Sequence, residues 1–448
     1  MILSINANRR IPIILLFADA VSVVAIFNLV SFLRGVGGGW FLWALTAPVM
    51  VNLISIHLID GYGSRADMLS VDYTSSHLIA TFFACLGTLI LTFVFIPAGF
   101  ELQGSRAVIL LSFALIGPVT LGYRRFLYSR TVVHRGGQHI VFVGGTTDFE
   151  IFDAECKRMG TKAPRIHADT TENFAAFKSV LDDISSSRLQ VEAIALKESG
   201  RDLPPEAPLS LVQLYFDGTP TYTLELFHQV YWRKIPLYRI NPIWLFQEGF
   251  QIAREPVFER LKRLSDIMFS VVGLILAFPF VAAAALAIKL DDSGPVFFVQ
   301  PRVGWHRRKF NLIKLRTMSV SDSQGDPYTR QGDARITRVG RFLRSARLDE
   351  FPQLWNVLRG QMSLIGPRAE WDRLVAGYEK DIPSYHFRHL VKPGITGWAQ
   401  VNYRYGTGID DTLRKLEYDL YYIRNFSFML DASIVLKTLH VMLLRKGR

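Results

Sequence analysis

Long apolar runs are the feature that most constrains how this 448-residue chain can fold. Four of them lie before residue 130, at residues 11–33, 40–59, 78–96 and 108–121. Each approaches the roughly 20 residues that a spanning helix needs, although the fourth is the shortest and contains Pro118. Arginines follow the fourth run at 124, 125, 130 and 135, so the positive-inside rule predicts a four-helix transmembrane domain over residues 1–130 with both ends in the cytoplasm. Asp19, inside the first run, is expected to pair helices.

A fifth apolar run, from Ile267 to Ile288, is also long enough to span a membrane. A simple transmembrane helix is one interpretation, but it would carry the basic C-terminal region to the opposite side from residue 130. Pro279 lies in the middle of the run, where it removes a helical hydrogen bond and disfavours helical geometry at Phe278. We therefore predict a re-entrant hairpin over residues 265–289 that enters one leaflet, breaks at Pro279 and returns.

The net charge of +12 belongs entirely to the C-terminal part of the chain. Residues 1–250 hold 20 basic and 20 acidic side chains, whereas residues 251–448 hold 31 and 19. Such a surface favours anionic headgroups or phosphorylated substrates. Because membrane spans are attached, we expect no nucleic-acid partner. Cys85 and Cys156 provide neither a disulfide framework nor a metal-binding spacing.

Residues 131–250 have the composition of a soluble α/β domain. The segment His139–Val143 is typical of a buried strand, and Gly144 and Gly145 follow it before a helical stretch. This opening is not a G-x-G-x-x-G fingerprint, so it gives only weak support for dinucleotide binding. Further strands are predicted at Val191–Leu196 and Leu211–Phe216. The pattern indicates a central Rossmann-like domain, followed by an aromatic-rich connector that ends near residue 250.

The stretch from residue 335 to residue 368 concentrates the candidate chemistry. Arginines recur at every third position, at 335, 338, 341, 344 and 347, and lead into the adjacent carboxylates Asp349 and Glu350. The spacing suits a helix with one cationic and one buried flank. The surrounding positive charge predicts a lowered pKa and an ionised carboxylate, which suits a nucleophile directed at a phosphoryl group. The alternative is a solvated helix with surface ion pairs.

Neighbouring carboxylates on a helix diverge, so Asp349 and Glu350 are expected to do different jobs. Lys314 and Arg316 would lie on one face of a strand over residues 309–318, which suits a diphosphate. The turn Gly366-Pro-Arg368 presents another arginine, and the glycine-rich loop at 392–404 is a plausible nucleobase and ribose cradle. His386 and His389 are interpreted as ordinary polar histidines.

At these residues the chain resembles the bacterial polyprenyl-phosphate hexose-1-phosphate transferases, also called monotopic phosphoglycosyl transferases. It is similar to their large form, which includes the undecaprenyl-phosphate galactose and glucose phosphotransferases. The matching features cover residues 255–448 almost continuously, whereas the N-terminal half matches only in layout. They are the proline-broken apolar run, Lys314–Met318, Arg344–Gly360, Met362–Arg368 and Pro393–Asn402.

The resemblance implies a membrane α/β enzyme whose catalytic domain, residues 255–448, faces the cytoplasm at the bacterial inner membrane. Asp349 would attack the β-phosphate of a UDP-sugar, release UMP and hold the sugar phosphate until a polyprenyl phosphate accepts it. Glu350 would bind Mg²⁺. The family's phosphate- and nucleotide-binding positions correspond here to Lys314, Arg316, Arg344, Arg368, Gln400 and Arg404. Large members are expected to be homodimers.

Two departures from the family pattern stand out. The usual Ser-Pro at the hairpin break is Phe278-Pro279, so a serine cap of the broken helix is missing. The usual Pro-Arg-Pro-Glu is Pro367-Arg-Ala-Glu370, which we expect to loosen the turn after Arg368. Two rival functions stay open: a non-catalytic membrane scaffold that binds nucleotide sugars for polysaccharide export, and a direct glycosyltransferase that releases UDP.

Overall fold

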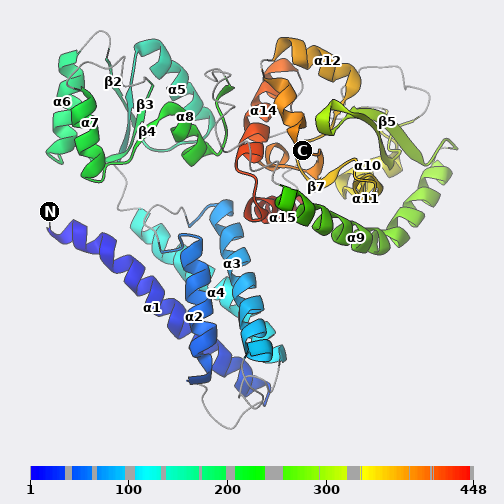
Figure 1. Cartoon of the computed structure of the whole chain (residues 1–448), viewed down its shortest axis with the longest axis horizontal. Coiled ribbons are helices and arrows are strands. Elements are labelled where there is room, and N and C mark those ends of the chain that lie inside the picture. Colours follow the sequence, from blue (N-terminus) through cyan, green and yellow to red (C-terminus); the bar gives the residue numbers. More distant parts are fainter. Residues whose placement is uncertain are drawn as a thin grey trace. The chain divides into compact units, whose positions relative to one another are not determined.

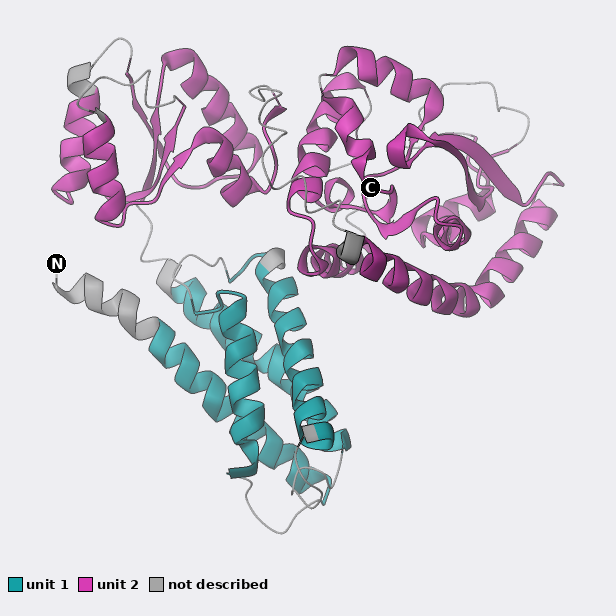
Figure 2. Cartoon of the chain, viewed as in Figure 1, with its two compact units in different colours: residues 1–136 teal, residues 137–448 magenta. Residues whose placement is uncertain are grey.

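The computed structural model describes the chain in segments, which together carry all the structural statements that follow. The described residues are 2–35, 43–62, 68–95, 106–132, 138–170, 174–197, 207–237, 256–291, 293–319, 333, 335–382, 384–403, 406 and 408–443. They form two compact units, Met1–Gly136 and Gly137–Arg448 (Figure 2). The predicted boundary between the middle and C-terminal domains, at residues 250–255, lies outside the described residues, so that division stays a prediction.

The first unit is a bundle of apolar helices (Figure 1). The bundle contains α1 Ile2–Leu33, the short turn η1 Trp43–Leu45, α2 Thr46–Leu58, α3 Val71–Ile90 with its π-helical extension η2 Leu91–Phe95, and α4 Arg106–Val132. Val23, Phe27 and Ile109 pack in its core, whereas Phe17 and Phe82 are exposed. Apolar side chains on the outside are what helices surrounded by lipid require, because lipid does not penalise them.

The helices agree with the four apolar runs and show how far each extends in the described residues. By length and composition, Pro12–Leu33, Tyr73–Val94 and Arg106–Arg130 can each cross a membrane. The second run contains the shorter apolar helix Trp43–Leu58. The fourth run is the core of α4, which continues through Pro118 and on to its basic end. Proline is tolerated inside membrane helices when neighbouring groups satisfy the freed carbonyl.

A buried polar cluster joins the helices of the first unit. The carboxylate of Asp19 on α1 pairs with the guanidinium of Arg124 on α4, and both side chains have no exposed surface. Asp19 also accepts a hydrogen bond of 2.6 Å from the hydroxyl of Tyr62 and another from Tyr123. Arg124 donates 2.9 Å to the hydroxyl of Tyr73. The expectation that Asp19 pairs helices is confirmed.

The second unit opens with a parallel sheet whose order is β2-β1-β3-β4. Its elements are β1 His139–Val143, α5 Thr146–Arg158, β2 Arg165–Ala168, α6 Phe174–Ser185, β3 Val191–Leu196, α7 Ala207–Phe216, β4 Thr221–Thr223, α8 Leu224–Phe227 and the π-helical turn η5 His228–Trp232. Val141 and Val143 face α6 and α7, whereas Ile140 and Phe142 face α5 and α8 (Figure 1). This alternation buries both faces, as parallel sheets require.

The sheet confirms two predicted strands and corrects a third. β1 and β3 lie where the buried runs at His139–Val143 and Val191–Leu196 predicted them. The predicted strand at Leu211–Phe216 is wrong, because those residues form the C-terminal part of helix α7. Leu211 and Leu214, three residues apart, are buried against the sheet, which is a helical rather than a strand period.

The long apolar helix α9 spans Pro256–Asp291. The predicted break at Pro279 is not an interruption of the helix, since Pro279 lies inside one continuous element. Figure 1 shows α9 curved along its length, as expected where a proline removes one internal hydrogen bond. Phe278 and Phe280 are exposed beside it. The correction is therefore from a broken hairpin to a bent helix, and its path through a membrane remains a prediction.

The remaining elements form a compact layer of short strands and helices beside α9. They are β5 Phe297–Val303, η10 Trp305–Arg307, β6 Lys309–Leu315, α10 Arg338–Ser345, η11 Leu348–Glu350, α11 Gln353–Leu358, β7 Ser363–Ile365, β8 Glu370–Trp371, α12 Asp372–Asp381, η12 Tyr385–Leu390, β9 Gly394–Thr396, α13 Trp398–Asn402, α14 Ile409–Arg424 and α15 Phe428–Leu443. The antiparallel sheet has the order β6-β5-β8, and β7 pairs with β9 in parallel. These sheets position the candidate site.

Candidate active site

The carboxylate pair lies on a short turn between two helices. Helix α10 begins at Thr337, whose hydroxyl accepts a hydrogen bond of 2.9 Å from the backbone of Gly340. A side chain at Gly340 would collide with the carbonyl of Thr317, so α10 approaches β6 closely. After α10 the chain turns through Arg347 in the left-handed conformation, with φ of 58°. Backbone strain of this kind is common at functional sites.

The turn η11 therefore presents Asp349 and Glu350 separately from the preceding arginine helix. The helix predicted from the spacing of Arg338, Arg341 and Arg344 is confirmed as α10, and it ends before Arg347. Asp349 is buried, with 9% of its surface exposed, whereas Glu350 is partly exposed. The two neighbours thus have different surroundings, as the prediction of separate roles requires.

Lys314 on β6 is the cation whose electrostatics are most altered by this site. Burial, together with the nearby guanidinium groups of Arg302, Arg368 and Arg344, lowers its pKa to about 8, while Asp349 opposes them. Its ammonium lies 5.0 Å from the ring centre of Phe298, directly across the sheet from it. The structure thus brings Lys314, Arg344, Arg368 and Asp349 into one electrostatic cluster.

The pKa of Asp349 differs from the expectation. Burial and, after it, the charge of Glu350 raise this pKa to about 6, against the opposing effects of Lys314 and Arg344. The prediction of a lowered pKa was wrong because it counted the nearby cations but not the loss of solvent. Asp349 is still mainly ionised at neutral pH. A carboxylate in this state is a better nucleophile than one with an ordinary pKa, since it is less stabilised by its surroundings.

Glu350 is oriented by two arginines. Its Oε1 lies 3.5 Å from Nη1 of Arg368 and 3.8 Å from Nη1 of Arg347. The two arginine side chains keep 39% and 43% of their surface exposed, so they can also reach a ligand from solvent. Arg347 was not among the predicted site residues, although it closes the arginine series in the sequence.

Two further arginines, which the sequence analysis missed, hold the turn that carries Arg368. Arg388 on η12 donates 3.0 Å to the carbonyl of Arg368, and Arg302 on β5 donates 2.9 Å to the carbonyl of Ala369. Arg388 is itself paired with buried Asp419 at 2.8 Å. The turn that lacks the family's second proline therefore keeps strong tertiary contacts. No local pattern singled out Arg302 or Arg388, because their role depends on carbonyls far away in the sequence.

The other predicted binding residues have mixed positions. Arg344 donates 2.8 Å from Nε to the hydroxyl of Thr317, and Arg316 is buried just after β6. Gln400 on α13 donates 3.0 Å to the carbonyl of Ile395. Its buried Oε1 has no hydrogen-bond partner in the described part of the chain. Arg404 lies outside the described residues.

Helix α9 is fixed to this layer by the polar residues of its first half. Asp266 accepts hydrogen bonds from the hydroxyl of Ser363 at 3.0 Å and from the backbone of Leu364 at 3.1 Å, both on β7. Arg263 donates to the carbonyls of Val357 and Leu358 at the end of α11. The apolar helix is thus tied to the strand and helix that flank the site.

Residues 257–445 match the family model described as bacterial sugar transferase. Over 187 residues the chain is 42% identical to the exopolysaccharide production protein PSS of Rhizobium leguminosarum bv. phaseoli, a match that covers 40% of this chain and 92% of that protein. The chain belongs to the bacterial sugar transferase family. The family match includes every residue placed in the site above.

Two other members of this family have more specific names. The UDP-N-acetylgalactosamine-undecaprenyl-phosphate N-acetylgalactosaminephosphotransferase of Aeromonas hydrophila is 47% identical over 189 residues, which are 42% of this chain and 45% of that protein. The undecaprenyl-phosphate glucose phosphotransferase of Komagataeibacter xylinus is 45% identical over 40% of this chain and 35% of its own length. The similarity thus spans less than half of both relatives. It confirms the resemblance seen in residues 255–448.

Among the described residues no three His, Cys, Asp or Glu side chains gather as a metal-binding group. The turn η11 carries two carboxylates, Asp349 and Glu350. A bacterial sugar transferase with this arrangement can supply one or two carboxylate ligands, which is how Mg²⁺ is usually held when substrate phosphates provide the rest.

Proposed function

We propose that the chain transfers a hexose-1-phosphate from a UDP-sugar to undecaprenyl phosphate and releases UMP, as the first membrane step of a polysaccharide. The observation that carries this proposal is the position of Asp349. It is a buried carboxylate with a pKa of about 6, surrounded by the cations of Lys314 and Arg344. The names of the related undecaprenyl-phosphate sugar phosphotransferases support the choice of substrates.

The proposed reaction has two displacements at one phosphorus atom. A carboxylate oxygen of Asp349 attacks the β-phosphorus of the UDP-sugar, and the bond from that phosphorus to the bridging oxygen breaks. The bridging oxygen and its electron pair leave as part of UMP, so Asp349 holds the sugar phosphate as an acyl phosphate. A phosphate oxygen of undecaprenyl phosphate then attacks the same phosphorus. The carboxylate of Asp349 leaves with its electron pair, and the lipid diphosphate sugar is the product.

The cations are suited to both displacements. Charge builds on the phosphoryl oxygens and on the departing UMP, and fixed cations stabilise that charge without reorganising. Lys314 is protonated below its pKa of about 8, and Arg368 is presented by a turn that Arg302 and Arg388 hold. One such cation lost from a site of this type typically costs about 10²-fold in rate.

Glu350 is the proposed ligand for Mg²⁺. Its carboxylate is partly exposed beside Asp349, and its negative charge raises the pKa of that residue, so a cation bound at Glu350 would relieve an existing repulsion. When bound, the metal would neutralise charge on the diphosphate. The contacts of Glu350 with Arg368 and Arg347, at 3.5 and 3.8 Å, are long enough to rearrange around a metal and phosphate.

The membrane helices suit a lipid-linked acceptor. Helix α9 exposes apolar side chains on most of its surface and is tied by Asp266 to the strand β7 of the site layer. We propose that the curved helix α9 enters the cytoplasmic leaflet and returns from it, which keeps the site at the level of the lipid phosphates. The first unit would anchor the enzyme in the inner membrane.

The nucleotide that leaves distinguishes this function from its rivals. The purified full chain is incubated with Mg²⁺, undecaprenyl phosphate and a panel of UDP-sugars, and released nucleotides are separated by chromatography. UMP is expected, together with a lipid diphosphate sugar. UDP as the product would mean direct glycosyl transfer, and binding of UDP-sugars without any release would mean a scaffold. Either result would overturn the proposal.

A further inference from the structure

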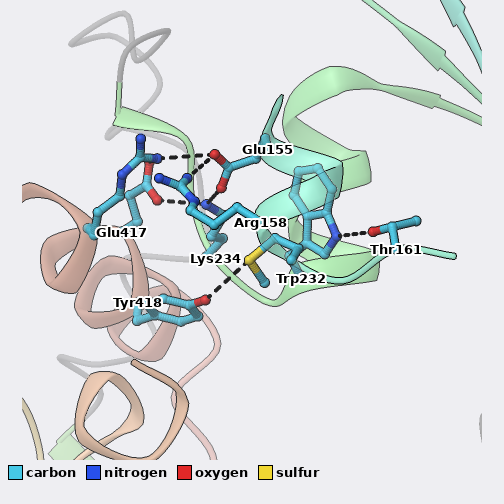
Figure 3. Close-up of polar contacts among 9 residues, drawn as sticks. Glu155, Arg158, Thr161, Trp232, Lys234, Glu417 and Tyr418 are labelled. Atoms are coloured by element: carbon cyan, nitrogen blue, oxygen red, sulfur yellow. Dashed lines mark hydrogen bonds and ion pairs between the residues drawn. The ribbon is translucent and has the colours of Figure 1, made fainter. Parts of the chain in front are cut away.

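A buried lysine connects the parallel-sheet part of the second unit to the helices behind the site. The side chain of Lys234 is only 2% exposed, and its ammonium pairs with Glu155 on α5 and, at 2.9 Å, with Glu417 on α14 (Figure 3). Glu417 has no exposed side-chain surface. The mechanism proposed above uses none of these three residues, yet they bury three charges together.

Buried charges such as those of Lys234, Glu155 and Glu417 are stable only when each has an oppositely charged partner. Removing ions from water is costly, and only the mutual attraction of close partners offsets that cost. Burial lowers the pKa of Lys234, while Glu417 opposes that effect. Arg158 on α5 also pairs with Glu155, and Arg414 on α14 adds a third cation, with Nη1 at 3.3 Å from Glu155 and 3.8 Å from Glu417. The contact therefore resists displacement, because moving α5 away from α14 would separate charges that are buried together.

The backbone around Lys234 contacts the same helices. The carbonyl of Arg233 accepts a hydrogen bond of 2.9 Å from the indole nitrogen of Trp398, and the backbone nitrogen of Ile235 donates 3.0 Å to the carbonyl of Glu417. Arg233 adopts a left-handed conformation, with φ of 50°. Three consecutive residues thus attach to α13 and α14, and one of them accepts an unusual backbone geometry to do so.

Trp398 links this attachment to the predicted substrate loop. It is the first residue of α13, is 1% exposed, and lies two positions before Gln400. On its other side the ammonium of Lys437 lies 4.4 Å from the ring centre and donates 2.8 Å to Asn402. The indole is therefore held between the Arg233 carbonyl and Lys437. The position of α13 depends on both contacts.

Helix α14 carries the same attachment to the segment that follows α13. Lys415, two residues before Glu417, donates 2.6 Å to the carbonyl of Gly406. Asp411 accepts 2.8 Å from the hydroxyl of Tyr403. A shift of α14 at Glu417 would therefore move the supports of Tyr403 and Gly406, which lie on either side of the predicted nucleotide-binding position Arg404 in the sequence.

We propose that residues 233–235 form a positioning clamp for the donor substrate, in which Lys234 and the Arg233 carbonyl hold α13 and α14 so that Gln400 and Tyr403 are placed to fit the nucleotide. This inference rests on the proposed function. It assigns the parallel-sheet part a role in UDP-sugar binding through the clamp, without contact with the reacting atoms. Lys234 and Trp398 are thus positioning residues, and their effect belongs to the donor rather than to the lipid acceptor.

Two variants test the clamp in the full chain. Trp398→Phe keeps an aromatic ring but removes the indole donor to Arg233, and Lys234→Met removes the bridging charge while keeping much of the side-chain length. Lys234→Arg is the conservative variant, and Lys157→Met, at an exposed lysine of α5, is the matched control. For Trp398→Phe we expect the KM for the UDP-sugar to rise about tenfold, since one buried hydrogen bond is lost. The KM for undecaprenyl phosphate should stay within about twofold, because the clamp acts on the donor side of the site.

Lys234→Met should raise the KM for the UDP-sugar more than Trp398→Phe does and leave the KM for undecaprenyl phosphate unchanged. Lys234→Arg should partly restore the KM for the UDP-sugar. Lys157→Met should change neither value. Hydrogen–deuterium exchange of the same proteins gives a second measurement that does not depend on activity. Peptides covering 398–403 should exchange faster in both variants, while those covering α10 and η11 should not. If the unchanged protein released no UMP, the proposed function would fail, and exchange alone would then decide whether the clamp exists.

Three results would overturn the clamp. Unchanged exchange at 398–403 in Trp398→Phe would mean that the contact does not hold α13. Equal rises in the KM of donor and acceptor would indicate general loosening of the fold. Faster exchange with an unchanged donor KM would make the contact structural only. Trp398→Phe retains the buried charges, so it keeps the test decisive even if Lys234→Met does not fold.

Discussion

Two buried aspartates, one in each unit, show how the surroundings of a carboxylate decide its use. Asp19 has no exposed surface and receives the Arg124 guanidinium and the hydroxyls of Tyr62 and Tyr123. Asp349 is nearly as buried, but its burial is not fully offset, and its pKa is raised to about 6. A carboxylate that is completely hydrogen-bonded stabilises a fold. A carboxylate whose loss of solvent is only partly offset by nearby cations is suited to act as a nucleophile.

The largest expected effect is the loss of transfer in Asp349→Asn. The amide cannot act as the nucleophile, so UMP release should fall at least about 10³-fold. Stability should not fall, because the raised pKa means that ionised Asp349 opposes folding as the pH rises from about 4 to about 6. The variant should melt at or above the temperature of the unchanged protein at pH 7.5, measured by thermal denaturation in detergent. A much lower melting temperature would show that Asp349 is structural, like Asp19.

Asp19→Asn should produce the opposite pattern. Removing one member of a buried ion pair leaves the other charge uncompensated, which typically costs about 3–5 kcal/mol. We expect a clear fall in the melting temperature of the first unit and in the yield of folded protein. The rate of UMP release per folded molecule should stay close to that of the unchanged protein. Asn28→Ala on the same helix, which removes a hydrogen bond to Val24 but no ionised group, is the control. A selective loss of turnover in folded Asp19→Asn would contradict the comparison.

Arg368 offers a sharper version of the same comparison within the site. Arg368→Ala removes a cation near Lys314 and Glu350, so the rate of UMP release should fall about 10²-fold. Its effect on melting should be small, because the side chain is 39% exposed and the turn is held through backbone carbonyls. Arg307→Ala, at an exposed pair with Glu379, is the matched control. Similar losses in both variants would mean that bulk positive charge matters, rather than this position.

The smallest effect concerns the pH dependence of the first displacement, measured as UMP release without the lipid acceptor. Asp349 must be ionised, so the rate should fall tenfold per unit as the pH drops below about 6. Lys314 must be protonated, so the rate should also fall as the pH rises above about 8. In Lys314→Arg the alkaline limb should disappear, because a guanidinium does not titrate there. If the rate of UMP release instead fell with a midpoint near pH 4, the pKa of Asp349 would not be raised, and nearby cations would fully offset its burial.

Particular residues show which parts of the fold and of the site could be predicted from the sequence. The buried apolar runs predicted β1 and β3 correctly. A similar apolar run at Leu211–Phe216 was predicted to be a strand but forms part of a helix that packs on the sheet. The Asp349-Glu350 pair was visible as a local pattern, but Arg302 and Arg388 were not. Their partners are carbonyls 67 and 20 residues away, so no spacing rule could connect them.

The sequence by itself determined the apolar helices, the location of the positive charge and the family, because these depend on composition and on motifs that are continuous along the chain. Only the tertiary structure decided that α9 continues through Pro279, that Asp349 has a raised pKa, and that Lys234 joins two parts of the second unit. Those properties depend on solvent exclusion and on distances between residues far apart in sequence, which arise only when the chain has folded.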